Sequence, residues 1–157
     1  MKRHLEKVYD KCRRQLFACA LSVTRCRDLA EDAIHEVFCR LLQQEVVPHN
    51  LKAYVFSSVR NCAIDLVRQM NRTTELVDDY IIDPSDNQRE TAGKKQFHQL
   101  VADALAALSE DERETVVQHL YADLTFREIA DLRNRPIGTI TTWYNRGLAK
   151  LRDRLEE

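Results

Sequence analysis

The sequence predicts an all-α protein made of two small helical domains joined by a flexible acidic linker. Three observations favour this fold class. Only three glycines and three prolines occur in 157 residues, so the turn-forming residues that an all-β fold needs are scarce. Leu, Arg and Ala, which all favour helix, are the three most common residues. Apolar residues recur at steps of three or four in both halves, whereas the acidic segment between them lacks this period.

Residues 1–72 are expected to form the first domain from three helices. The first is predicted over about residues 4–24, along one apolar stripe. The second is predicted to begin at Asp28, a good N-cap residue, because a Glu stands three residues later as a capping-box partner. The third is predicted over about residues 51–70, after a break at Pro48, which cannot continue a helix.

Residues 73–96 are predicted to form the linker, and residues 97–157 the second domain. Within the second domain, capping-box sequences beginning at Ser109 and Thr125 each predict the start of a helix. A tight turn is expected around Asn134, since Asn tolerates the left-handed backbone conformation. A short helix, a tight turn and a longer helix form the helix-turn-helix arrangement, whose second helix enters the major groove of DNA.

The last helix is expected to run from Pro136, which suits a first helical turn, to about Leu155. Its inward stripe is predicted to consist of Ile137, Ile140, Tyr144, Leu148 and Leu151. Its outward side is predicted to present hydroxyl, amide and basic groups to base edges and phosphates. The outward residues are Thr139, Thr142, Trp143, Arg146 and Lys150, with Thr141 and Asn145 flanking them.

The net charge of −1 hides an asymmetry along the chain. Residues 1–72 hold 13 Lys and Arg against 8 Asp and Glu, and the remainder is acidic overall. Because phosphate contacts depend on local clusters of charge, the net charge does not exclude DNA binding. The chain begins with a densely charged segment and holds no long apolar run, so neither a signal peptide nor a membrane span is predicted. A cytoplasmic location is expected.

All five cysteines lie in the first half, and no two form a CxxC pair. They are predicted to be reduced thiols packed as small apolar residues. His35 and Cys39 stand four residues apart, as two metal ligands on one helix turn could. Without a second pair of ligands, a surface His beside a buried Cys is the preferred interpretation. No metal, cofactor or catalytic residue is predicted.

Four segments carry a resemblance to a known family. They are Asp28–Phe38, Tyr54–Asp65, Leu124–Ala130 and Pro136–Ile140. In this order, around an acidic linker, they resemble the extracytoplasmic-function sigma factors, the smallest members of the main bacterial sigma family. Arg133 and Arg135 depart from that pattern, because relatives usually keep apolar residues in the turn.

The resemblance implies a role for each matching residue. Asp32 and Glu36, with Phe38 nearby, stand where the family docks on the β′ clamp helices of core RNA polymerase, and an acidic face suits a basic partner. The β flap of the polymerase is the second implied contact. The implied readers of the minus-ten promoter element are His49, Asn50, Lys52, Tyr54, Arg60, Asn61 and Arg68. The implied readers of the minus-thirty-five element are Thr139, Thr141, Thr142, Trp143, Asn145, Arg146 and Lys150.

Several interpretations stay open at this point. Trp143 either touches DNA or belongs to an interface with a regulator, and DNA is preferred. Many relatives are held inactive by an anti-sigma partner packed between the two modules, and the predicted linker is compatible with one. A polymerase-independent helix-turn-helix regulator would explain the second domain but leave Asp32, Glu36 and Asn61 without a role. A thiol- or metal-dependent enzyme or sensor would rest on the cysteines and His35 alone.

Overall fold

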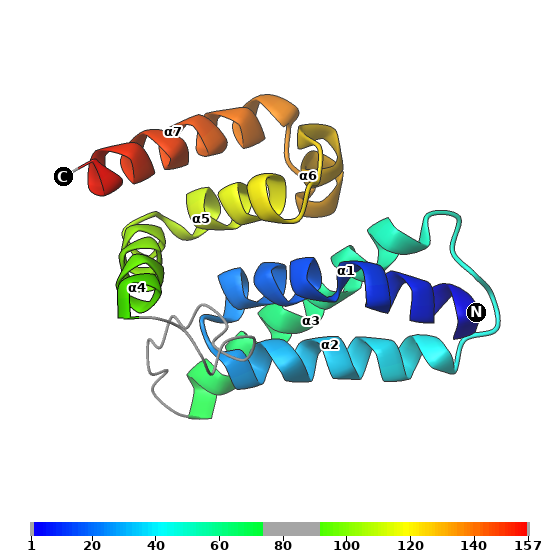
Figure 1. The fold of residues 1–157 in the computed structure, drawn as a ribbon. Coiled ribbons are helices and arrows are strands. Elements are labelled where there is room, and N and C mark those ends of the chain that lie inside the picture. The colour runs from blue at the N-terminus through cyan, green and yellow to red at the C-terminus, as the bar shows by residue number, and fades with distance from the viewer. Residues whose placement is uncertain (1, 74–91, 157) are drawn as a thin grey trace.

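The computed structural model describes residues 2–73 and 92–156, and every element in these two stretches is a helix (Figure 1). The predicted all-α class is therefore confirmed. Most of the predicted linker lies outside the described residues. Its two ends are corrected, because Thr73 closes one helix and residues 92–96 begin the next. No helix in the described stretches is long and apolar enough to cross a membrane.

The first half is a bundle of three helices, α1 (Lys2–Thr24), α2 (Arg27–Leu42) and α3 (Leu51–Thr73), each in contact with the other two. The predicted Asp28 cap is wrong. Cys26 is the N-cap residue of α2 and makes no side-chain capping bond. Instead the Thr24 hydroxyl accepts a hydrogen bond from the Cys26 backbone N–H at 3.3 Å and donates one to the Cys26 carbonyl at 2.9 Å. Asp28 lies two residues further on, in the first turn of α2, where its charge still favours the helix N-terminus.

The second half contains α4 (Ala92–Ala106), α5 (Glu110–Val116), a π-helical turn η2 (Val117–Tyr121), α6 (Phe126–Arg133) and α7 (Ile137–Leu155). Both predicted capping boxes are confirmed. In each box the hydroxyl of the Ser or Thr accepts a hydrogen bond from the backbone N–H of the Glu three residues later. The carboxylate of that Glu accepts a hydrogen bond from the backbone N–H of the Ser or Thr. Asn134 closes α6 with a φ of 52°, as the predicted turn requires.

The inward face of α7 differs from the predicted stripe. Ile140 is fully buried, but Ile137 is 51% exposed because it stands at the open N-terminal end of the helix. Gly147 is buried instead. A Cβ atom at Gly147 would lie 2.7 Å from Cγ2 of Val116 on α5, so the absence of a side chain lets α5 and α7 approach closely.

The two halves pack against each other. Helix α1 contacts α5 and η2, and α3 contacts α6. One buried core includes Leu16 and Cys19 of α1 together with Leu124 and Ile129 of the second half. Neither half is large enough to bury much apolar surface alone, so this contact adds burial that both lack. The predicted pair of domains is thus one packed unit in the described residues.

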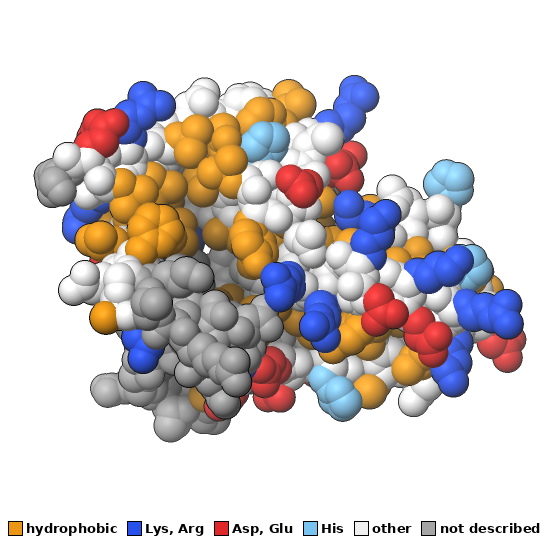
Figure 2. Space-filling view, viewed as in Figure 1, with side chains coloured by type: hydrophobic (Ala, Val, Ile, Leu, Met, Phe, Trp, Pro, Cys, Tyr) orange, Lys and Arg blue, Asp and Glu red, His pale blue; other side chains and the backbone are white. Residues whose placement is uncertain are grey.

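The two halves present different surfaces. On the face shown in Figure 2, charged side chains gather over α1 and α2, while apolar side chains gather over α4, α5 and α7. Exposed large apolar residues of the second half include Phe97, Leu100 and Leu155. An exposed apolar surface is typical of a face that binds another protein.

The close approach at Gly147 predicts a stability effect. Gly147→Ala should destabilise the protein by about 1 kcal/mol, because overpacking against Val116 outweighs the gain in helix propensity. Gly138→Ala is the matched control, since nothing lies within 4 Å of a Cβ atom there, and it should not destabilise. Urea unfolding followed by circular dichroism measures both. Adding Val116→Ala should relieve the clash, and no relief in the double variant would contradict this packing argument.

Candidate polymerase and nucleic-acid interface

The predicted docking residues lie on the outer side of α2. Asp32 and Glu36 are exposed on successive turns of the helix. Phe38 is half-buried, and its ring contacts that of Tyr9 edge-on with 5.3 Å between the ring centroids. The structure therefore offers the two carboxylates to a partner, while Phe38 also holds α2 against α1.

A polar groove between α2 and α3 brings several predicted residues together. Its lining includes Glu36 and Arg40 from α2 and Tyr54, Asn61 and Asp65 from α3, around a volume of about 420 Å³. Tyr54 is 41% exposed, so its ring can stack on a partner, and Asn61 is exposed as well. The groove thus places Glu36, which is expected to contact polymerase, close to Tyr54 and Asn61, which are expected to contact the minus-ten strand.

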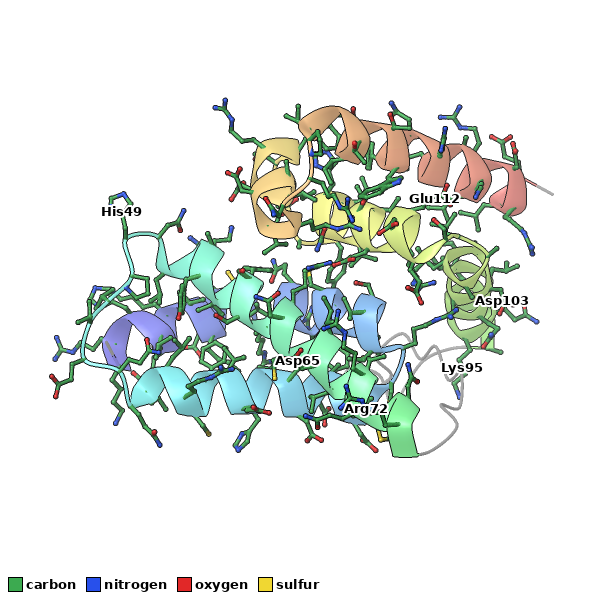
Figure 3. The ribbon with its side chains drawn as sticks, turned by 180° about the vertical axis from the view of Figure 1, so that it is seen from behind. His49, Asp65, Arg72, Lys95, Asp103 and Glu112 are labelled. Carbon is green, nitrogen blue, oxygen red and sulfur yellow. The ribbon has the colours of Figure 1, made fainter. Side chains whose placement is uncertain are left out.

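The loop before α3 holds the other predicted minus-ten readers. His49 is exposed at the end of this loop, far along α3 from Asp65 and Arg72 (Figure 3). The side-chain oxygen of Asn50 accepts a hydrogen bond from the Ala53 N–H at 3.2 Å, so Asn50 also caps α3. Lys52 and Arg68 are exposed.

A second groove of about 420 Å³ lies where the two halves meet. One wall carries His49, Asn50 and Tyr54. The other wall is α6, which contributes Glu128 and Asp131. Two carboxylates therefore stand across from residues that are expected to touch the promoter strand.

Arg60 is predicted to contact the minus-ten strand, but in this structure it is paired with a residue of the second half. Its Nε donates a hydrogen bond to Oε1 of Glu114 on α5 at 2.5 Å. The side chains are 20% and 8% exposed, so the pair lies largely out of solvent. Asn61 stays exposed beside it, but Arg60 in this arrangement is paired within the protein and not open to a phosphate.

The Glu114 carboxylate also receives donors from its own half. Nε2 of Gln118 donates to it at 3.2 Å, and Nη2 of Arg133 lies 3.3 Å from its second oxygen. A further bond between the halves runs from Nε of Arg113 to the Ser22 carbonyl at 3.3 Å. These contacts compensate the burial of charge, which would otherwise be unfavourable.

Arg133 lies in a buried position that the sequence argument did not foresee. Its Nη2 donates to Asp111 at 2.6 Å, its Nη1 donates to the Thr115 hydroxyl, and its guanidinium lies 4.6 Å from the centre of the Trp143 ring. Burial lowers the pKa of Arg133, and the negative charge of Glu114 opposes that shift. The sequence did show that Arg133 is basic where relatives keep an apolar residue. The residues that Arg133 contacts are distant in the chain, so they could not be predicted from the sequence.

The recognition face of α7 is narrower than predicted. Trp143 and Lys150, both predicted to contact DNA, also have partners within the protein. Trp143 is half-buried under Arg133, and Nζ of Lys150 donates to Oε1 of Glu112 at 2.7 Å. Burial alone would raise the pKa of Glu112, but hydrogen bonds from Lys150 and Ser109 hold it below its usual value.

The remaining predicted residues stay near the N-terminal part of α7. Thr142, Asn145 and Arg146 are exposed, and Thr139 and Thr141 are half-buried. The hydroxyls of Thr141 and Thr142 both donate to the Gly138 carbonyl, which leaves their oxygen lone pairs and methyl groups for a partner. This set can contact base edges and phosphates in a major groove.

The cysteines divide by burial. Cys12, Cys19 and Cys62 are buried as predicted, and Cys26 is intermediate. Cys39 is exposed, which corrects the expected buried thiol, and its Sγ lies 3.6 Å from Nε2 of His35. Among the described residues, no three His, Cys, Asp or Glu side chains are grouped so that they could hold a metal ion.

Two family models match the chain. The model described as sigma-70 region 2 matches residues 8–73, which include the docking face and the polar groove. The model described as sigma-70, region 4, matches residues 98–151, which include the helix-turn-helix. Together they cover both packed halves.

Individual relatives agree with these models. The chain is 23% identical over 133 residues to the ECF RNA polymerase sigma factor SigM of Bacillus subtilis (strain 168), covering 83% of this chain and 82% of that one. It is similar in fold to the sigma factor RpoE of Bartonella quintana, solved in complex with the anti-sigma factor NepR. That likeness has a TM-score of 0.77 and 23% identity and covers 99% of this chain and 96% of that one.

Thiol reactivity should follow the burial of the cysteines. Burial, then the charge of Glu36 and its acceptance of a hydrogen bond from the thiol, raise the pKa of Cys62 to about 11. Because the thiolate is the nucleophile, iodoacetamide at about pH 8 should modify exposed Cys39 long before Cys62. Mass spectrometry of peptides over time measures the rates, and protein unfolded in urea is the control. Equal rates in the folded protein would contradict this account.

Proposed function

The chain belongs to the sigma-70 family, as an extracytoplasmic-function sigma factor, and we propose how its two halves divide the work of initiation. Such a factor binds core RNA polymerase and directs it to specific promoters. Residues 1–72 are assigned to polymerase docking and to recognition and opening of the minus-ten element. Residues 97–157 are assigned to recognition of the minus-thirty-five element. Sigma factors are non-catalytic, and we assign no reaction to this chain.

The observation that supports this division best is the polar groove between α2 and α3. It places Glu36, a docking carboxylate, beside Tyr54 and Asn61. An amide both donates and accepts hydrogen bonds, so Asn61 can read the edge of an extruded base. An exposed ring such as Tyr54 can stack on the strand. A factor built in this way holds the separated strand close to the polymerase that it has just bound.

The other assigned contacts follow the exposed side chains. His49, Asn50, Lys52 and Arg68 are assigned to the minus-ten strand, and Thr139, Thr141, Thr142, Asn145 and Arg146 to the minus-thirty-five duplex. The apolar surface of the second half, with Leu100 and Leu155, is assigned to the β flap. We place this work in the cytoplasm, where bacterial polymerase meets DNA.

A polymerase-independent regulator is the weaker alternative. It would use the helix-turn-helix but would give no role to the exposed Asp32 and Glu36 or to the groove that holds Asn61. We also propose that an anti-sigma protein controls this factor. The support is its structural likeness to a relative solved with such a protein bound.

In-vitro transcription with purified core polymerase on a pooled promoter library tests the assignment. The wild-type chain should create new start sites that share two motifs at a fixed spacing. Asp32→Lys with Glu36→Lys should abolish these starts and the binding to core, because like charges would face a basic partner. Duplex binding by the wild type without new starts would favour the free-standing regulator.

A charge-matched control separates docking from net charge. Glu6 and Asp10 are exposed on α1 and also stand four residues apart. Changing both to Lys alters the net charge equally, but the transcripts should remain. If both double variants lose activity alike, the assignment of docking to α2 is wrong.

Asn61→Ala should impair promoter opening more than polymerase binding. The loss of one base-reading amide should reduce open-complex formation by about tenfold, while affinity for core changes little. Permanganate reactivity of unpaired thymines measures opening. Gln44→Ala, which removes an exposed amide just beyond the C-terminal end of α2, is the control. Equal loss of opening and of core binding would argue against base reading.

A further inference from the structure

We propose that Arg133 is a positioning residue for recognition of the minus-thirty-five element. It is the last residue of α6, and its side chain links Trp143 of α7 to α5. This link holds the part of α7 that is expected to face DNA in one orientation. The inference rests on the proposed role of α7 in reading the minus-thirty-five element.

The guanidinium of Arg133 bonds to α5 at several points. Its Nη2 donates to Oδ1 of Asp111 at 2.6 Å, and its Nη1 donates to the Thr115 hydroxyl and, at 3.3 Å, to the Asp111 carbonyl. Arg133 is 7% exposed, so little water competes for these bonds. A guanidinium presents its donors in a rigid planar fork. Acceptors on one helix therefore fix the orientation of the group as well as its position.

The same guanidinium contacts α7 through Trp143. Its central carbon lies 4.6 Å from the centre of the indole ring, a distance at which a cation is attracted to the face of the ring. The ring is half-buried at this contact. Since Arg133 is bonded to α5, and α5 lies beside α7 (Figure 1), the contact ties the two helices together near the turn.

This tie lies on one side of the buried face of α7, and a second contact lies on the other side. Successive residues of a helix are about 100° apart, which places Trp143 and Tyr144 on either side of the fully buried Ile140. The ring of Tyr144 contacts the rings of His119 and Phe126, with centroids 4.7 and 5.0 Å away. A helix held on both sides of its buried face resists rotation about its own axis.

The residues that are expected to read bases stand next to Trp143. Thr142 precedes it, and Asn145 and Arg146 follow within one turn, all three exposed. Each base pair presents its donors and acceptors at fixed places in the major groove, so these side chains must be held in register with them. Rotation of α7 would move all three together. Arg133 therefore affects sequence preference without touching a base.

Competition between two templates tests the inference. One carries a promoter recovered from the pooled library, and the other carries the same promoter with its upstream motif scrambled. Both are transcribed in one reaction with core polymerase, and the ratio of the two transcripts measures the preference. Arg133→Met should reduce this ratio about tenfold, roughly the loss of one base-specific contact, while the affinity for core polymerase does not change.

The ratio separates positioning from lost stability, because a smaller amount of folded protein would lower both transcripts alike. Ile129→Val, which removes one buried methyl group from α6 and no polar group, is the control for stability and should leave the ratio unchanged. An unchanged ratio in a folded Arg133→Met protein would overturn the inference.

Asp111→Asn is a second variant that should keep the fold, because the side chain is 56% exposed. It removes the charge that faces Arg133, so it should reduce the ratio about threefold. Glu110→Gln is the matched control, since it removes the same charge at the neighbouring exposed position of α5. Equal responses to these two substitutions would also overturn the inference.

Trp143 is the only tryptophan in the sequence, so its fluorescence reports on the contact directly. Acrylamide should quench it faster in Arg133→Met than in the wild type, and equal quenching would contradict the proposed link. The proposed function can fail separately. If the wild type transcribes both templates equally, the minus-thirty-five assignment is wrong, whereas the quenching still shows whether Arg133 holds Trp143.

Discussion

The Glu114 carboxylate is the contact on which the arrangement of the helices depends. It joins α5 to α3 through Arg60 and to the turn of the helix-turn-helix through Arg133. Burying a charge is unfavourable unless donors surround it, and here two guanidinium groups and an amide do so. One side chain therefore relates the position of the recognition helix to that of the helix expected to hold the promoter strand.

The two expected contacts of the first half differ in how open they are. Asp32 and Glu36 face solvent in the packed molecule, whereas the Arg60 side chain and the minus-ten loop lie at the contact with the second half. The first expected contact is therefore open in the packed molecule, whereas the second lies partly behind α5 and α6.

Local physics explains which features could be predicted from the sequence. The capping boxes at Ser109 and Thr125 and the turn at Asn134 depend on residues a few positions apart, so they were predictable. The roles of Arg60, Trp143 and Lys150 depend on partners far away in the chain. Their polar or aromatic character indicated an outward face. In the structure Arg60 and Trp143 are half-buried against Glu114 and Arg133, and the exposed Lys150 pairs with Glu112. The predicted docking carboxylates, Asp32 and Glu36, lie exposed on α2, as their polar character indicated.

The glycine at position 147 sets how closely α5 and α7 approach where they cross. Thr141 lies six residues toward the N-terminus of α7, so the lever arm from the crossing is about 9 Å. A tilt of about 10° at that point would displace the end of α7 that is expected to face DNA by about 1.5 Å. Hydrogen bonds tolerate changes of only a few tenths of an ångström, so this displacement is enough to break them. Promoter preference could therefore drift through residue volume at this crossing, without any change in the side chains that touch DNA.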